Sequence, residues 1–590
     1  MFLHSVCTAA FLASSALAQF VTPPTNLTTK KGYLDIPVRY KQVPTGICET
    51  TPGVKSYSGY VDIAPEQHIF WWFFETRHGN PSEAPLTVWI NGGPGSSSMI
   101  GLFQELGPCG IDANYNVVSN PYSWNNASNM LFIDHPAQVG FSYSKPIPGY
   151  KNTNGDIIQV PDASCPDYAQ AYGTCGTYSY ANQSDTANST ANAAPSMWKT
   201  LQGFMGAFPQ YARNGFHFTT ESYGGHYGPV FNEYIETQNA LIKRGRLQGA
   251  KEIQLESVMI GNGWYRPLVQ YAAYYNYTVY PGNPYDYSPY NKTIQDQLYN
   301  AMYGQGNCYD QTVDCNTRGI NSICAAADSF CANEVESVLD NVAVRDEYDI
   351  REPYNDPFPP TFYVQYLNTP YVQQAIGAYV NFSESSNTVG AAFASTGDDD
   401  REDNTIEDVQ ALLKKGIYVV QYYGDADYNC NYLGGQVVAD EINAFGYSSA
   451  GFTNISTSDK IVHGQVRQSG NFAFARIYES GHEVPFYQPV VALELFERVL
   501  QRKDVATGRQ DIGYGYKTSG PLQSTYREGN STLVFDDLPV TATYNTTTNR
   551  PNPVTNSTTS AHLKKRGQMG ARSVLKRNAR VFKPSYEKRK

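Results

Sequence analysis

The chain has 590 residues, a formal net charge of −11 at pH 7 and 41% hydrophobic residues. This length would permit several ordinary domains and leaves ample apolar sequence for a buried core. We find no phosphate-cradling loop, no Cys/His spacing of a metal centre and no basic–aromatic pattern of a nucleic-acid-binding protein. We therefore expect a large globular protein with no cofactor, no metal and no nucleic-acid partner.

The first residues have the pattern of a signal peptide. A short apolar run over residues 9–18 ends in Ala16-Leu17-Ala18, which matches an A-x-A cleavage pattern before Gln19. The run is too short to cross a bilayer as a helix. We expect residues 1–18 to be a signal peptide, the mature protein to be secreted and extracellular, and no transmembrane segment.

Acceptor sites for N-linked glycans follow along the whole chain. The N-x-S/T sequons stand at Asn26, Asn126, Asn182, Asn188, Asn276, Asn291, Asn381, Asn454, Asn530, Asn545 and Asn556. On a secreted chain this density predicts a surface that carries N-linked glycans.

Four segments in the first quarter of the chain have the pattern of β-strands. Residues 58–63 and 69–75 predict a hairpin, and residues 86–90 and 129–134 predict buried strands.

A glycine-rich turn follows the strand at 86–90. It reads Asn91-Gly92-Gly93-Pro94-Gly95. Because glycine has no Cβ atom, backbone N–H groups in such a turn can approach a substrate oxygen closely and stabilise an oxyanion. The alternative is a tight turn that needs positive φ. A simple turn does not require so many glycines in one place, which favours the functional interpretation.

The most informative segment has one serine between a strand and a helix. Residues 216–220 predict a strand and residues 227–235 a helix, with Ser222 and two glycines between them. A serine at such a sharp turn is exposed beside the helix N-terminus, as a nucleophile requires. Thr220 replaces the first glycine of the usual G-x-S-x-G pattern, and a glycine-rich loop with an incidental serine is the alternative.

An acid and a histidine follow two later strands. Residues 417–423 predict a buried strand that leads to Asp425 and Asp427, and residues 472–478 predict another that leads to His482. Nucleophile, acid and histidine, in this order and each after a strand, are typical of the α/β-hydrolase fold.

One large domain explains this order better than several independent domains. We predict an α/β protein: an α/β-hydrolase fold with a cap-like insertion between the nucleophile and the catalytic acid. The catalytic domain is expected over residues 19–515, with a further strand at 255–261. The insertion is expected at about 268–360, where Tyr, Asn, Pro and Cys are frequent and strand patterns are few. Its tyrosines could line a binding cleft or pack the insertion itself.

Four motifs together resemble the serine carboxypeptidases, in particular the fungal secreted enzymes of the S1 type and the carboxypeptidase D-like enzymes. They are Asn91-Gly92-Gly93-Pro94-Gly95-Ser96-Ser97, Glu221-Ser222-Tyr223-Gly224-Gly225-His226-Tyr227, Gly424-Asp425-Ala426-Asp427-Tyr428-Asn429-Cys430-Asn431 and Gly481-His482-Glu483-Val484-Pro485. The resemblance implies a serine-type carboxypeptidase that removes C-terminal residues from peptides and proteins at acidic pH.

The resemblance also implies roles for single residues. Ser222 attacks the scissile carbonyl, His482 transfers its proton, and Asp427 orients His482. The backbone N–H groups of Gly93 and Tyr223 form the oxyanion hole.

Other residues match family positions that bind the free α-carboxylate of the substrate. These are Asn91 and Glu221, assisted by the Gly92 backbone and by Glu105. If Glu221 is buried near a second acid, its pKa rises and its neutral form donates a hydrogen bond to the carboxylate. Substrate binding should then be strongest in acid and weaken toward neutrality. Asp425 is expected to have a structural role.

Glu483, directly after the predicted catalytic histidine, bears on specificity. In the family a Glu here often accompanies a preference for C-terminal Arg or Lys, because an anion in the leaving-residue pocket pairs with a basic side chain. The alternative is that Glu483 points to solvent.

Ten cysteines are present, one of them, Cys7, in the signal peptide. The simplest pairing of eight others is Cys48–Cys109, Cys165–Cys175, and Cys315–Cys324 nested inside Cys308–Cys331. A sequence does not determine connectivity, so other pairings stay open. Cys430 is left unpaired, at a position where the resemblance implies a cysteine beside the substrate.

The C-terminal region differs in composition from the rest. Residues 516–561 are rich in Thr, Asn, Ser and Pro, which predicts a glycosylated, disordered stalk, and residues 562–590 predict a basic disordered tail. The chain shows no hydrophobic C-terminal run, so we expect no GPI anchor unless the true C-terminus differs.

Three other functions remain open on the sequence alone. A secreted lipase or esterase would share the Ser–Asp–His order, but would not need Asn91 and Glu221 as carboxylate binders. An acyltransferase would use the same nucleophile. A catalytically inactive surface glycoprotein could keep the fold, although intact Ser222, Asp427 and His482 argue against it.

Overall fold

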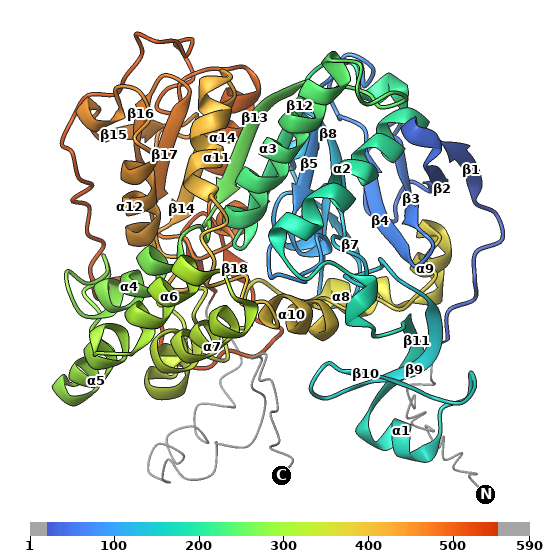
Figure 1. Cartoon of the computed structure of the whole chain (residues 1–590), viewed down its shortest axis with the longest axis horizontal. Coiled ribbons are helices and arrows are strands. Elements are labelled where there is room, and N and C mark those ends of the chain that lie inside the picture. Colours follow the sequence, from blue (N-terminus) through green and yellow to red (C-terminus); the bar gives the residue numbers. More distant parts are fainter. Residues whose placement is uncertain (1–19, 553–590) are drawn as a thin grey trace, which may run out of the picture.

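A computed structural model describes residues 20–552 (Figure 1). The predicted signal peptide, the end of the predicted stalk and the basic tail at 562–590 lie outside this part of the chain.

A mixed twelve-stranded β-sheet forms the centre of the molecule. Across the sheet the strands are β1 (Thr28–Lys31), β2 (Pro37–Val43), β3 (Ser56–Ala64), β4 (Gln67–Phe74), β8 (Asn129–Ile133), β5 (Leu86–Ile90), β12 (Phe216–Glu221), β13 (Leu255–Gly261), β14 (Tyr418–Gly424), β17 (Phe472–Ile477), β16 (Val462–Ser469) and β15 (Thr453–Ser456). The six strands from β8 to β17 run parallel, and the outer strands pair antiparallel.

The eight strands predicted from the sequence are confirmed, including the β3–β4 hairpin. The two outermost strands on each side, β1 with β2 and β15 with β16, were not predicted. β1 reads Thr-Thr-Lys-Lys and is exposed at every position, so it lacks the alternation that marks a half-buried strand. Edge strands are defined by their partner more than by their own side chains.

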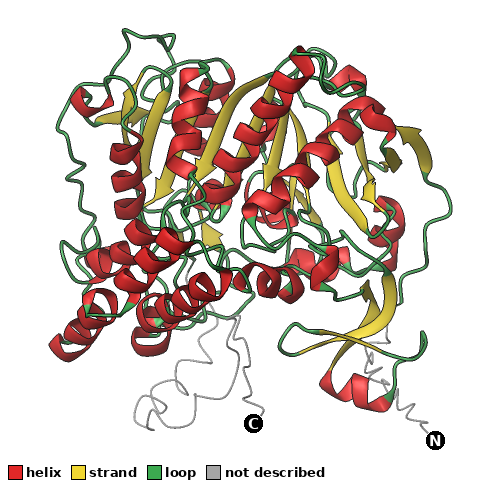
Figure 2. Ribbon diagram, viewed as in Figure 1, coloured by secondary structure: helices red, strands yellow, loops and turns green. Residues whose placement is uncertain are grey.

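The sheet is buried on both faces, so each central strand sends alternate side chains into two separate cores. Val88 of β5 packs into one core and the adjacent Trp89 into the other. The first core lies under α2 (Thr190–Ala207), α3 (Gly224–Lys243), α11 (Thr405–Lys414) and α12 (Tyr432–Ile442). The second lies under α14 (Pro489–Leu500), α8 (Phe362–Leu367) and α9 (Pro370–Ile376). Helices on both faces of a largely parallel sheet confirm the predicted α/β-hydrolase class (Figure 2).

A helical insertion leaves the sheet after β13 and returns before β14. It begins with α4 (Pro267–Thr278), α5 (Lys292–Tyr303), α6 (Cys308–Arg318) and α7 (Asn321–Cys331), followed after two short helical turns by α8 and α9, then α10 (Asn387–Ala394) and α11. Backbone bonds fix it to the loop after β14: Ile350 N–H donates to Ala426 O, and Tyr428 N–H donates to Glu347 O. The part that contains Glu347 and Ile350 therefore lies at the carboxyl ends of the parallel strands, whereas α8, α9 and α11 cover the faces of the sheet.

Four disulfides are present, and they join the cysteines as the simplest pairing predicted. They are Cys48–Cys109, Cys165–Cys175, Cys308–Cys331 and Cys315–Cys324. Cys430 is a free, buried thiol, also as predicted.

A small three-stranded sheet projects from the body at the lower right of Figure 1. It consists of β9 (Pro146–Asn152), β10 (Ile157–Gln159) and β11 (Gly173–Ser179), with α1 (Asp167–Tyr172) before β11. The sequence analysis did not predict it, since prolines and glycines interrupt its strands. Short strands also occur as β6 (Cys109–Ile111) with β7 (Val117–Ser119) and as β18 (Tyr544–Asn545) with β19 (Arg550–Pro551), and α13 (Val484–Tyr487) precedes α14.

The segment 516–552, expected to belong to a disordered stalk, lies against the domain. Arg476 donates to Tyr526 O, the rings of Tyr478 and Tyr526 stack at 3.7 Å, and Val534 N–H donates to Arg351 O. Aromatic side chains within the Thr- and Asn-rich sequence supply these contacts, which composition alone does not reveal.

One predicted glycan acceptor is inaccessible in the folded chain. Asn381 is 6% exposed, accepts a hydrogen bond from Thr177 N–H and donates one to Asn368. A glycan on Asn381 would require these hydrogen bonds to break. We therefore assign Asn381 a structural role and not that of a glycan acceptor.

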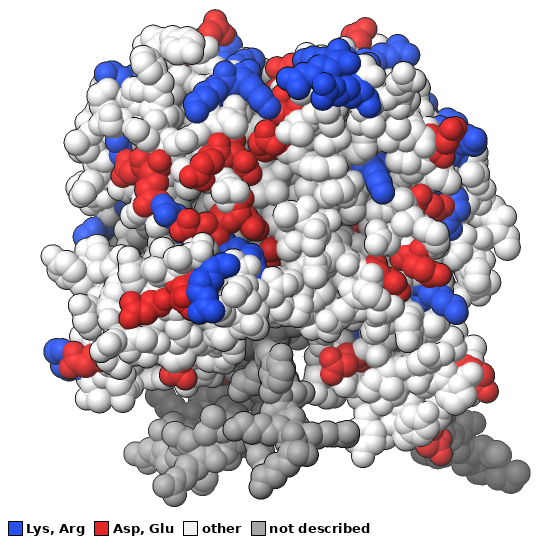
Figure 3. Space-filling model, in the orientation of Figure 1, with Lys and Arg blue, Asp and Glu red and all other residues white. Residues whose placement is uncertain are grey.

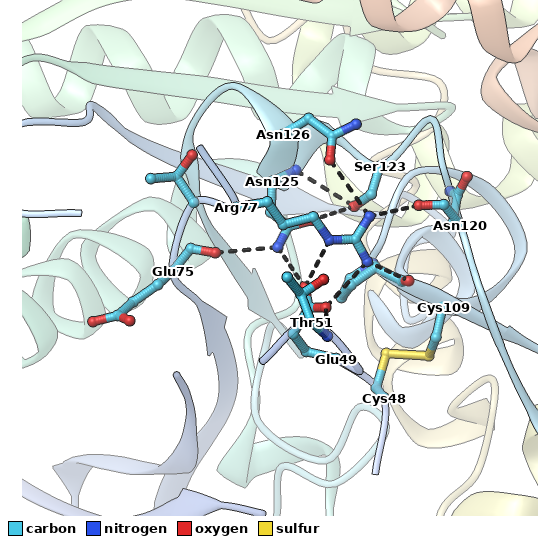
Figure 4. A network of polar contacts seen from close by, with 12 residues as sticks. Cys48, Glu49, Thr51, Glu75, Arg77, Cys109, Asn120, Ser123, Asn125 and Asn126 are labelled. Atoms are coloured by element: carbon cyan, nitrogen blue, oxygen red, sulfur yellow. Dashed lines mark hydrogen bonds and ion pairs between the residues drawn. A yellow bond between two sulfur atoms is a disulfide. The ribbon is translucent and has the colours of Figure 1, made fainter. Parts of the chain in front are cut away.

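A buried polar network supports the segment that follows the glycine turn (Figure 4). The Arg77 guanidinium donates to both Glu49 oxygens, at 3.0 and 3.2 Å, and to Asn120 O at 2.6 Å. Asn120 in turn donates to Glu105 O. The network thus holds the backbone of Glu105, one of the predicted site residues.

Charged side chains are unevenly distributed on the surface. Figure 3 shows acidic side chains in the middle of the viewed face, and Lys and Arg along its upper edge, where α3 and α11 end with Lys243 and Lys414. Among residues 20–552, no helix combines the length and the apolar run that crossing a bilayer requires.

The fold predicts that replacing two different phenylalanines will have very different effects on the free energy of unfolding. Phe474 in β17 is fully buried, with the rings of Tyr423 and Phe452 at 5.4 and 6.1 Å, whereas Phe445 is 76% exposed. Phe474→Ala should lower the free energy of unfolding by about 3–5 kcal/mol because it leaves a cavity. Phe445→Ala, the matched control, should change it little. Urea unfolding measures both, and equal effects would contradict the core assignment.

Candidate active site

Ser222 lies at the sharp turn between β12 and α3, as the sequence predicts. Its φ is 63°, in the left-handed region that non-glycine residues rarely adopt. Two backbone bonds hold this conformation: Ser222 N–H donates to Gly261 O at 3.0 Å, and Trp264 N–H donates to Ser222 O at 2.8 Å. Such an outlier persists only where its surroundings determine it, and it is frequent at functional sites.

The two glycines after the serine are required by close packing. A Cβ atom on Gly224 would lie 2.9 Å from Thr220 Cβ, and one on Gly225 would lie 2.5 Å from Trp264 N. Thr220, the departure from the usual glycine pattern, is therefore accommodated because Gly224 leaves room for its side chain.

His482 and Asp427 form a buried hydrogen-bonded pair. Their Nδ1 and Oδ2 atoms are 2.7 Å apart, and neither residue is more than 7% exposed. Asn262 also donates to Asp427 Oδ2, at 2.7 Å, and Cys430 N–H donates to Oδ1. Three donors thus fix the carboxylate, and the carboxylate fixes the imidazole.

Burial disfavours the charged form of His482, but the charge and hydrogen bond of Asp427 outweigh it. With smaller contributions from Glu221 and Glu483, they raise the pKa of His482 to about 9.

Ser222 lies next to the Cys430 thiol. The sulfur of this thiol, one oxygen of the Asp427 carboxylate and one nitrogen of the His482 ring lie within 4.8 Å of one another. The three predicted catalytic residues therefore converge at the carboxyl end of the sheet. Between residues 20 and 552 there is no hydrogen bond from Ser222 to His482, a contact that often tightens only when substrate binds.

The glycine turn packs directly against Ser222. A Cβ atom on Gly92 would lie 2.9 Å from Ser222 Cβ and even closer to Tyr223 N. In the described chain neither Gly93 N–H nor Tyr223 N–H donates to a protein acceptor. Both N–H groups remain available to a ligand oxygen.

Asn91 joins the turn to the residue before the serine. Its Nδ2 donates to Glu221 Oε1 at 2.7 Å, and its Oδ1 accepts from Trp89 Nε1 at 2.8 Å and from Gly101 N–H at 3.0 Å. These bonds fix the orientation of the amide and place its NH₂ group at Glu221.

Glu221 and Glu105 are buried side by side next to Asn91. Burial raises the pKa of Glu221 to about 7; the charge of His482 opposes the rise and that of Asp427 adds to it. Neither Glu105 oxygen accepts a hydrogen bond within the described part of the chain. Burial and the nearby Glu221 and Glu483 carboxyls raise the pKa of Glu105 well above its usual range. This pair holds a proton in acid.

Glu483 is half-buried, and one of its carboxyl oxygens points toward the same interior. Its Oε2 atom is buried without a hydrogen-bond partner in the described structure. Burial and the Glu221 charge raise its pKa well above the usual range, and His482 opposes the rise. The carboxyls of Glu105, Glu221 and Glu483 therefore lie close to one another and to the His482 ring.

Asp425 has the structural role that the sequence analysis expected. It accepts two hydrogen bonds from the Arg476 guanidinium, one from Tyr285 Oη and one from Glu479 N–H. The buried ion pair joins the loop after β14 to β17, and so joins the loops that carry Asp427 and His482.

Three side chains of the types that can bind a metal ion lie together behind Tyr223. They are His226, Asp398 and Asp403. Asp398 accepts hydrogen bonds from Thr190 and from Tyr223 Oη, and His226 lies 3.5 Å from Asp403. These bonds support the N-termini of α2 and α3 and give Asp398 a structural role, whereas neither His226 nitrogen has a hydrogen-bond partner within the described residues.

Sequence reasoning missed two residues of this site. Asn262, which binds Asp427, follows β13 directly, and a polar residue after a buried strand was the available signal. Tyr348, whose ring lies 5.0 Å from that of His482 and whose carbonyl accepts from His482 N–H, had no such signal. It comes from the insertion, where no motif marks it.

Comparisons with known proteins identify the family of this chain. The family model for serine carboxypeptidase matches residues 44–159 and 171–502. Carboxypeptidase S1 homolog A of Arthroderma otae is 40% identical over 86% of this chain and 83% of its own length. Carboxypeptidase S1 of Penicillium janthinellum is 38% identical over 78% of this chain and 99% of its own length.

A solved structure shares the fold. KEX1ΔP, a prohormone-processing carboxypeptidase from Saccharomyces cerevisiae, superposes with a TM-score of 0.62 at 20% identity, over 78% of this chain and 95% of its own. Together, the family match over most of the chain, the similarity to the S1 enzymes and the α/β-hydrolase fold show that this chain belongs to the serine carboxypeptidase family.

Proposed function

We propose that the protein is a secreted carboxypeptidase that removes single residues from peptide C-termini in acid, with a preference for C-terminal Arg and Lys. The observation that carries this proposal is the juxtaposition of two groups: a Ser222–His482–Asp427 constellation and a buried Asn91–Glu221 pair directly beside it. Esterases and acyltransferases of this fold need the first group but not the second.

In the first half-reaction Ser222 Oγ attacks the scissile carbonyl carbon, and His482 Nε2 accepts the hydroxyl proton. Asp427, bonded to Nδ1, keeps the imidazole in the tautomer that has a free Nε2 and stabilises the imidazolium. The N–H groups of Gly93 and Tyr223 bind the oxyanion. His482 then protonates the leaving amine, which departs as a free amino acid and leaves an acyl-enzyme.

In the second half-reaction water replaces the amino acid. His482 accepts a proton from the water, whose oxygen attacks the ester carbonyl of the acyl-enzyme. The same two N–H groups stabilise the second oxyanion. Collapse returns the proton from His482 to Ser222 and releases the shortened peptide.

The buried amide and carboxyls explain the restriction to chain ends. Asn91 Nδ2 and a protonated Glu221 both donate, and a carboxylate accepts from both. Gly92 allows the substrate backbone to approach. Glu105, whose carboxyl has no protein donor, supplies the second carboxyl of the pair that keeps the proton. An internal peptide bond would leave these donors unpaired, at a cost of about 1–3 kcal/mol for each.

Secretion is supported by the predicted signal peptide and by four disulfides, which persist in oxidising compartments. The basic preference is supported by the position of the Glu483 carboxyl beside His482, because a bound Arg or Lys cation would favour its ionised form.

Removal of the catalytic groups should abolish peptide hydrolysis while leaving the fold intact. Relative to wild type, we expect kcat to fall by about 10⁶ for Ser222→Ala and about 10⁴ for Asp427→Asn. A fluorophosphonate should label wild type but not Ser222→Ala. Labelling of Ser222→Ala at the wild-type rate would identify a different nucleophile and refute the mechanism.

The pH dependence of KM should follow Glu221. Its pKa is raised to about 7, so the neutral, donating form dominates below that pH, and the anion that repels the substrate carboxylate dominates above it. KM for a free-acid peptide should therefore rise through pH 7. Glu221→Gln cannot ionise and should flatten this rise.

An ester substrate without a free carboxylate serves as the control, and its KM should not change through pH 7 in either protein. A Glu221→Gln enzyme that kept the wild-type rise would refute this explanation.

Selectivity for the leaving residue should depend on Glu483. We expect Glu483→Met to lower the ratio of kcat/KM for C-terminal Arg over Leu by at least about tenfold, or ~1.4 kcal/mol, because the cation loses its partner. Glu441→Met, at a surface ion pair with Arg266, is the matched control. Mass spectrometry of a peptide pair that differs only in the last residue measures the ratio, and an unchanged ratio in Glu483→Met would exclude the proposed pocket.

A further inference from the structure

We infer that Asp134, at the carboxyl end of β8, is a positioning residue for this reaction. It fixes residues 91–98 against Ser222, and through them sets the places of both the oxyanion donor Gly93 and the carboxylate binder Asn91. The inference rests on the proposed function.

Asp134 is fully buried and binds the far end of the turn through one oxygen. Its Oδ1 accepts from Ser97 Oγ at 2.6 Å and from Ser98 N–H at 3.0 Å. Burial raises the pKa of Asp134 to about 6, and the hydrogen bonds donated by Ser97, Phe141 N–H and Ser98 N–H oppose this rise. The turn is therefore tied to a strand of the central sheet, the most rigid element nearby.

A second step leads from Ser98 to the site. Ser98 Oγ donates to Ile133 O at 2.5 Å and accepts from Asn91 N–H at 3.2 Å. Asn91 then donates to Glu221 at 2.7 Å. A continuous series of hydrogen bonds thus runs from Asp134 to the group that grips the substrate carboxylate.

The turn tolerates little movement. Gly92 is already so close to Ser222 Cβ and Tyr223 N that a single added methyl group would clash with both. Movement toward Ser222 is blocked, and movement away withdraws Gly93 N–H from the oxyanion. On its other side the turn is held by backbone bonds only, from Ser97 N–H to Glu384 O and from Ser386 N–H to Gly95 O.

Asp134 is itself fixed and does not reach the reacting atoms. Its Oδ2 accepts from Phe141 N–H at 2.8 Å, and its backbone N–H donates to Phe70 O. Gly140 lies against the carboxylate so closely that a Cβ atom there would be 2.8 Å from Oδ1 and closer to Oδ2. Its influence on catalysis therefore passes through the turn.

The test compares Asp134→Asn with Asp504→Asn in the full-length protein. An amide cannot accept at both ends, so its NH₂ group must face either the Ser97–Ser98 donors or Phe141 N–H. Asp504 is an equally buried aspartate that accepts from Thr507, Arg509 and Gln510 N–H groups. It follows Lys503, whose carbonyl binds Tyr418 at the start of β14, and so lies at the opposite end of the sheet from Ser222.

Each variant is assayed on a free-acid peptide and on the corresponding ester without a free carboxylate. For Asp134→Asn we expect kcat to fall about 10²-fold on both substrates, the loss produced by a displacement of roughly 1 Å. KM should rise several-fold on the free acid only, because Asn91 acts only there. Asp504→Asn should lose comparable thermal stability and change neither constant.

A double-mutant cycle adds a second readout. If Asp134 acts through Ser97, then Ser97→Ala and Asp134→Asn should affect kcat non-additively. Equal kinetics for Asp134→Asn and Asp504→Asn, with wild type active, would overturn the inference. A wild-type protein that hydrolyses neither substrate would instead refute the proposed function, so the two failures are distinguishable.

Discussion

The backbone turn at Ser222 is the constraint on which the site depends. A left-handed residue between a fully buried strand and a buried helix end exists only because four neighbours leave no alternative: Gly261, Trp264, Gly224 and the Gly92 backbone. These neighbours belong to β13, the loop after it, α3 and the glycine turn. The parallel sheet brings their carboxyl ends together, so the sheet register determines where the hydroxyl points.

The glutamate carboxyls beside this turn affect both substrate binding and the protonation of His482. Ionised Glu221 and Glu483 help His482 to retain its proton, whereas a general base must be neutral before it acts. When Glu221 is protonated to hold a substrate carboxylate, this part of its effect on the imidazole disappears. Acid thus favours the donor that holds the chain end and removes one of the charges that stabilise the imidazolium, which leaves Asp427 as the main partner of His482.

Much of the fold and of the site could be read from residues whose environment is local. The strands β5, β12 and β14 are buried at every position, and Asn91, Ser222 and Asp427 follow them at the carboxyl end of the sheet. The four cysteine pairs match the simplest pairing along the chain, although a sequence leaves connectivity open. Features that depend on residues distant in the sequence could not be predicted. β1 has no pattern of its own, and Tyr348 reaches His482 from an insertion without motifs. Tyr526 stacks on Tyr478 from a segment whose composition predicts disorder.

The insertion between β13 and β14 is joined to the catalytic site at a few points. It leaves the sheet after one strand and re-enters before the next, and two backbone bonds, Ile350 to Ala426 and Tyr428 to Glu347, attach it to the loop that carries Asp427. Other parts of it contact the site directly: Tyr348 lies against the His482 ring, and Glu384 and Ser386 bond the glycine turn. A substitution at one of these contact points would therefore reach the reacting groups, although the insertion lies far from Ser222, Asp427 and His482 in the sequence.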